Sequence, residues 1–116
     1  TTVMDVSNYF RAGGQVVTQN ASVRRIVGWA ACNGTPTCNI ILARIRPVED
    51  NNSDVAPVIV HDIQWTALAS HDKLKALNVT SITAGDVAAG DILVTFVKTG
   101  SGNVLYFNLN VELQVG

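Results

Sequence analysis

Apolar and polar residues alternate strictly along the last part of the chain, over residues 105–115. Every odd position there is apolar, and the even positions hold Tyr106, Asn108, Asn110, Glu112 and Gln114. A period of two is typical of a strand with one face on a core, whereas an amphipathic helix has a period of about 3.6 residues. The pattern therefore predicts a long final strand and a sheet that receives it.

A second pattern covers residues 92–98, where odd and even positions are both apolar. Ile92, Val94 and Phe96 would lie on one face of a strand, and Leu93 and Val97 on the other. Strands with this composition are buried on both faces. The segment is therefore predicted to be a central strand that is covered twice.

Shorter β-prone segments precede these two, after a turn predicted at Gly13-Gly14. They are residues 15–18, 23–31, 40–46, 57–66 and 78–83. The period of two places four apolar residues of 23–31 on one face, interrupted by Arg25: Val23, Val27, Trp29 and Ala31. It places Ile59, Ile63 and Trp65 on one face of residues 57–66, with His61 among them. Residues 67–77 carry a loose helical stripe, which predicts a short helix or an irregular crossover.

Strand follows strand with one crossover, which predicts an all-β protein with a single antiparallel β-sandwich domain over residues 1–116. Residues 1–14 form a possible N-terminal arm that pairs with a neighbouring subunit. A frayed terminus or an ordinary first strand are the alternatives for this segment.

Charge is sparse in this sequence. The 116 residues hold eight Lys and Arg against nine Asp and Glu, so the chain lacks the general basic footprint of a nucleic-acid-binding protein. Its apolar runs are too short to span a membrane. Arg24 and Arg25 would point to opposite faces of a regular strand. Polarity comes mainly from Asn, Thr, Ser and Gln, which suits extracellular and virion proteins.

Cys32 and Cys38 flank the dipeptide Asn33-Gly34, a strong signal for a hairpin turn. Residues 23–31 and 40–46 are accordingly predicted to pair as a β-hairpin with a cysteine at each shoulder. In a paired hairpin the two cysteines lie close enough for a disulfide, which is the expectation, with free thiols as the alternative. Their spacing does not match a zinc site.

Catalytic and metal-binding patterns are weak. Ser70, His61 and Asp62 supply the residue types of a triad, but no Gly-x-Ser-x-Gly elbow accompanies them. The four acidic residues Glu49, Asp54, Asp86 and Asp91 match no calcium-loop spacing, and Asp86 and Asp91 are expected to cap turns. Trp29 and Trp65 offer a sugar-stacking platform or, as expected, pack in the core. The prediction is a non-enzyme without cofactor or metal.

A resemblance enters at residues 82–86 (ITAGD) and 89–94 (AGDILV), together with the long closing strand. These resemble the jelly-roll β-sandwiches of virion decoration and fibre proteins, including the TNF/C1q-like modules, and residues 22–45 are similar to the early strands of that family. The resemblance covers most of the chain and rests on short motifs. It implies a jelly-roll-like fold, homotrimers and a role in assembly.

The functional hypothesis is a structural protein of a virion: a phage capsid decoration, minor capsid or fibre protein, located in the virion or outside the cell. Its expected partners are other copies of itself, as a trimer, and a major capsid protein. The expected assembly surface is Tyr106, Asn108 and Asn110. The alternatives are a carbohydrate-binding module and a filament subunit that exchanges its N-terminal strand.

Overall fold

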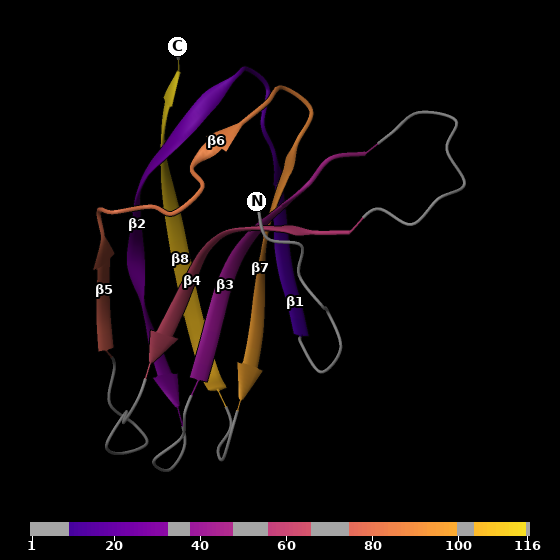
Figure 1. Cartoon of the computed structure of the whole chain (residues 1–116). Helices are drawn as coiled ribbons and strands as arrows, with labels where there is room; N and C mark the ends of the chain where they lie inside the picture. Colours follow the sequence, from indigo (N-terminus) through magenta and orange to yellow (C-terminus); the bar gives the residue numbers. More distant parts are fainter. Residues whose placement is uncertain (1–9, 33–37, 48–55, 66–74, 100–103, 116) are drawn as a thin grey trace.

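The structure, a computed structural model, describes residues 10–32, 38–47, 56–65, 75–99 and 104–115. They form the strands β1 (Phe10–Val16), β2 (Ala21–Cys32), β3 (Cys38–Ile45), β4 (Val58–Trp65), β5 (Lys75–Val79), β6 (Asp86–Val87), β7 (Ile92–Thr99) and β8 (Val104–Val115). Their pairings are antiparallel, and the described residues contain no helix. The all-β sandwich prediction is confirmed (Figure 1).

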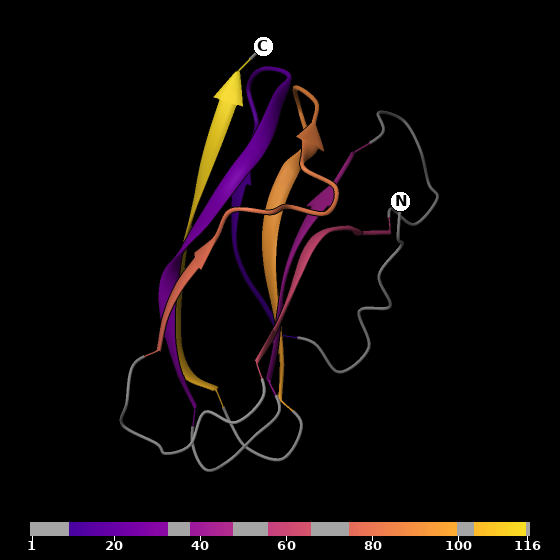
Figure 2. The ribbon, with the colours of Figure 1, turned by 60° about the vertical axis from the view of Figure 1, so that its left-hand side comes forward.

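Two sheets make up the sandwich, and they differ in width. Sheet A has the strand order β1-β7-β3-β4, whereas in sheet B the strands β5, β6 and β8 all pair with β2. Ile26 of β2 pairs with both β5 and β8, and Ser22 pairs with both β6 and β8. Because a strand has two edges, β5 and β6 share the edge of β2 that is opposite β8. Sheet B is therefore three strands wide and sheet A four. Figure 2 shows the two sheets as separate layers.

The main core lies between the sheets, and a second apolar cluster lies on the other face of sheet A. Leu93 and Val97 of β7 belong to the main core, together with Ile26 and Leu42. The intervening β7 residues join the second cluster, whose buried members are Ile41, Ala43, Val94 and Phe96. The prediction that β7 is a central strand covered on both faces is confirmed.

A β-bulge in β2 reverses which residues face the core. Val23 pairs with Leu113 and Arg25 with Glu112, so Arg24 is an extra residue. Before the bulge Ala21 and Val23 are buried, and after it the buried residues are Ile26 and Ala30. The prediction that Val23 shares a face with Val27 and Trp29, and that Trp29 packs in the core, is wrong, because the extra residue shifts the alternation by one. Trp29 is 37% exposed on the outer face of sheet B.

Bulges also interrupt β4 and β1. Leu42 pairs with His61 and Ala43 with Ile59, so Val60 is the extra residue of β4. Ile59 consequently packs against the second cluster, whereas Ile63 lies in the main core, and the prediction that they share a face is wrong.

In β1 the predicted turn at Gly13-Gly14 is instead a bulge, and Gly13 has φ 69°, a left-handed conformation that favours glycine. Of the predicted arm, residues 10–14 lie in β1. Residues 10–12 pair with β7 of the same chain, and residues 13 and 14 form the bulge in that pairing. Residues 1–9 lie outside the described residues.

The predicted hairpin of residues 23–31 and 40–46 is wrong. Both segments are strands, but β2 belongs to sheet B and β3 to sheet A, so the chain between them passes from one sheet to the other. The expected helix is also wrong where it can be examined, because residues 75–77 are part of β5. Residues 67–74 lie outside the described part.

Strands β2 and β8 approach each other closely at Gly28. A Cβ added there would collide with the carbonyl oxygen of Asn108 and lie 3.1 Å from the Cα of Leu109. These are backbone atoms inside a ladder, so they cannot rotate away. We expect Gly28→Ala to lower the free energy of unfolding by about 1–3 kcal/mol, as overpacking does.

Urea unfolding measures that loss. Gly14→Ala is the matched control, since its added Cβ meets only Ile92 Cγ2, at 3.7 Å. Equal stability of the two variants would contradict the close β2–β8 approach.

Candidate assembly site

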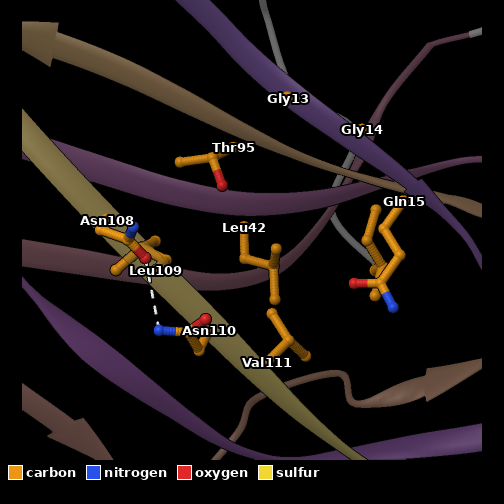
Figure 3. A pocket seen from close by; sticks show the side chains of 10 residues that line it. Gly13, Gly14, Gln15, Leu42, Thr95, Asn108, Leu109, Asn110 and Val111 are labelled. Atoms are coloured by element: carbon orange, nitrogen blue, oxygen red, sulfur yellow. Dashed lines mark hydrogen bonds between the residues drawn. The ribbon is translucent and has the colours of Figure 1, made fainter.

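The predicted assembly surface lies on β8, which carries its polar residues outward as predicted. Asn108 and Asn110 are exposed, and Leu109 and Val111 between and beside them are partly buried against the main core. Asn110 Nδ2 donates a hydrogen bond to Asn108 Oδ1 at 3.3 Å (Figure 3). Tyr106 pairs in register with Ala31, and its side chain is outside the described part of the structure.

Trp29 joins the same surface, which sequence reasoning missed. Its cross-strand neighbours are Asn108 on β8 and Ala76 on β5, and the next outward residue of β2, Val27, lies between Asn110 and Asn78. We call these six residues the Trp29 face: Val27, Trp29, Ala76, Asn78, Asn108 and Asn110. The indole of Trp29 therefore lies near three carboxamide groups, and the ion pair Arg25–Glu112 is the next outward pair beside Val27 and Asn110.

One feature of the sequence could have indicated that Trp29 faces outward: the adjacent arginines Arg24 and Arg25. In a regular strand one of two adjacent residues points inward, and burying an unpaired guanidinium is costly. The bulge lets both side chains face outward. Arg24 Nη1 donates to Gln114 Oε1 at 2.8 Å, and Arg25 Nε lies 3.1 Å from Glu112 Oε2. The expectation that the two arginines point to opposite faces is therefore wrong.

A groove opens beside β8, between its edge and β1, with a volume of about 410 Å³. Its floor is the inner face of sheet A, with Leu42 and Thr95, and its sides are the backbones of β1 and β8 (Figure 3). Gln15 of β1 and Val111 of β8 also line it. Apolar side chains of both sheets thus border an opening on this side of the sandwich.

Asp91 anchors the chain at the start of β7. Its side chain is fully buried and accepts hydrogen bonds from Arg46 Nε at 2.7 Å, Arg46 Nη2 at 2.9 Å and the Ala88 amide at 2.8 Å. The bond from Arg46 lowers the pKa of Asp91, against the opposing effect of burial. Val17 N donates to Asp91 O at 2.8 Å, so the same turn holds the end of β1.

These contacts support the turn-capping role predicted for Asp91, and they add Arg46, which the sequence did not single out. The second predicted capping residue, Asp86, accepts a hydrogen bond from Ser22 Oγ at 3.1 Å. Glu49 and Asp54 lie outside the described residues. Asp86 and Asp91 thus bind groups of the protein itself.

Of the three triad residues, only His61 and Asp62 lie in the described part of the structure. His61 Nδ1 lies 3.2 Å from Thr83 Oγ1, at the exposed side of β4. Ser70 lies outside the described residues, and Asp62 is the neighbour of His61 along β4.

The disulfide was predicted from a paired hairpin, and the structure does not contain that hairpin. Cys32 ends β2 and Cys38 begins β3, and these strands belong to different sheets. In register, Cys32 pairs with Val104 of β8, and Cys38 lies between β4 and β7. Residues 33–37 lie outside the described part, so the disulfide stays a prediction.

Comparisons with protein-family models, with curated proteins and with solved structures find no match to this chain. The jelly-roll resemblance therefore stays a hypothesis. Among the described residues there is no helix long and apolar enough to cross a membrane.

We expect Asp91→Asn to lower the free energy of unfolding by about 1–3 kcal/mol, because it removes the charge of a buried carboxylate that accepts hydrogen bonds from Arg46 and the Ala88 amide. Urea unfolding at neutral pH measures the loss. The exposed Asp86→Asn serves as the control, and a variant pair with equal stabilities would show that Asp91 does not anchor the turn.

The same carboxylate makes stability depend on pH. Its folded-state pKa lies below the value of about 3.9 for an unfolded aspartate, so the unfolded chain binds the proton more tightly. The contribution of Asp91 is thus fully present above that unfolded pKa and is lost as the pH falls through the lowered folded pKa. Stability measured from pH 6 down to pH 2 should fall less steeply in Asp91→Asn than in the parent protein. Parallel curves would rule out this linkage.

Proposed function

We propose that the protein is a non-enzymatic structural protein that works by self-assembly through the β8 side of sheet B. The observation that carries the proposal is the Trp29 face. Tryptophan is enriched at the centres of protein interfaces, where charged residues are depleted. An exposed indole among three carboxamides, with the nearest outward charges, Arg25 and Glu112, paired with each other, resembles that composition.

The edge of β8 supports the same proposal. Natural sheets protect long edges with charges, prolines or bulges. Strand β8 has twelve residues, and its outward row from Asn108 to Gln114 holds one charge, Glu112, which already pairs with Arg25. By contrast, the opposite edge of sheet B carries the five-residue β5, which begins with Lys75.

We further propose that the assembly belongs to a virion, as a capsid decoration, minor capsid or fibre protein. The polar but weakly charged composition and the jelly-roll resemblance support this role. Homotrimers docked on a major capsid protein are the form that the resemblance implies.

Sedimentation velocity of the isolated protein at micromolar concentration tests the proposal, and an oligomer is expected. Asn108→Lys should weaken association by about ten-fold or more while changing the free energy of unfolding by at most about 0.5 kcal/mol, because an exposed position is not core. Thr80→Lys adds the same charge at an exposed position after β5 and should associate normally. A parent protein that sediments as a monomer would contradict the proposal.

Carbohydrate binding is a second candidate, and the exposure of Trp29 favours it. The apolar face of a sugar ring stacks on an indole, and carboxamides both donate and accept hydrogen bonds to hydroxyl groups. A glycan array distinguishes the two functions. A glycan bound by the parent protein and lost in Asn108→Lys would support carbohydrate binding, and an array without any bound glycan would eliminate it.

A further inference from the structure

The unequal widths of the sheets leave the inner side of β1 without a strand of sheet B across from it. Strand β8, the edge of sheet B, approaches β7 across the core, and β1 lies one strand further out in sheet A. Residues 13–16 of β1 are exposed, Val16 to 60%. The groove beside β8 therefore lies where a fourth strand of sheet B would run.

The groove has the chemistry of a strand-binding site. Leu42 and Leu93 of sheet A and Val111 of β8 give it apolar surface, and none of its described lining residues is ionisable. Among the described residues β8 pairs only with β2. In an antiparallel ladder, N–H and C=O groups point to alternate edges, so about half of those on β8 face the groove side. An added strand would pair with them.

The space beside β8 accommodates a single added strand but not the edge strand of a second sandwich. Sheet A continues beneath the groove through β1. If β8 of a second molecule paired edge to edge with β8, the sheet A of that molecule would need the space that β1 occupies. An extended segment that has no second layer behind it avoids this collision.

We propose that the groove binds residues 1–9 of a second copy as an added strand. Residues 1–9 have no amphipathic pattern over their full length, but within residues 4–7 Met4 and Val6 alternate with Asp5 and Ser7. An extended conformation would direct the two apolar side chains toward the groove and the two polar ones toward solvent. Nine residues reach up to about 30 Å when extended. This inference rests on the proposed self-assembly and names the contact that produces it.

The contact is heterologous when the arm of each copy enters the groove of the next, whereas a reciprocal exchange between two copies closes as a dimer. A heterologous contact closes into a ring or continues as a filament. The predicted trimer corresponds to the closed form.

Full-length variants test the two halves of the contact separately. Val6→Asp places a charge on the groove side of the arm, and Ser7→Asp places it on the other side. Gln15→Lys places a charge in the groove, and Gln19→Lys places it at an exposed position outside the groove. Because an unpaired charge is costly to bury, Val6→Asp and Gln15→Lys should each raise the dissociation constant by about ten-fold or more, and the two controls should not. Circular dichroism checks folding, and Met4→Asp replaces Val6→Asp if that variant unfolds.

Mixing the two defective variants gives the decisive result. In a 1:1 mixture the intact arm of Gln15→Lys can enter the intact groove of Val6→Asp, so heterodimers should form although each variant alone is monomeric. Sedimentation velocity with one variant fluorescently labelled detects them.

Two outcomes would overturn the inference while leaving self-assembly in place: a parent oligomer that both variants retain, or variants that dissociate alone and stay monomeric when mixed. The second outcome would mean that the arm does not enter the groove of another copy. A monomeric parent would instead contradict the proposed function itself.

Discussion

The constraint on which the rest of this structure depends is the mismatch between a sheet four strands wide and a sheet three strands wide. Strand β2 has β8 along one edge and shares its other edge between β5 and β6, so β8 is the last strand of sheet B on its side. The same strand therefore supplies an outward row of carboxamides, a backbone edge and one side of the groove. The Trp29 face and the groove therefore lie on either side of the same strand, β8.

Local features hold this edge in place. The bulge at Arg24 brings two arginines to the surface and turns Trp29 outward beside Asn108. At the other side of the groove, the Asp91 turn binds the end of β1 through Val17, and Arg46 fixes that turn from the end of β3. The wall formed by β1 is thus anchored at its Val16 end, and the Gly13-Gly14 bulge leaves it without side chains over part of its length.

The sequence predicted what depends on alternation within a single strand. The period of two identified β8, and the doubly apolar pattern identified β7 as central. The sequence could not predict which strands pair. An Asn-Gly turn signal is local and does not show that the chain changes sheets between β2 and β3. It also failed after each bulge: one extra residue, at Arg24 or Val60, moves every later side chain to the other face. The outward positions Asn108 and Asn110 were found, whereas Trp29 and the groove depend on a bulge and on sheet width.

We propose that assembly takes place at the edge of β8 that faces the groove. Amide hydrogen exchange, followed residue by residue by NMR at concentrations above and below the dissociation constant, tests it most directly. If a strand adds to β8, association protects alternate amides within residues 108–111 and leaves those already bonded to β2 unchanged. Association accompanied by unchanged exchange throughout β8 would contradict it.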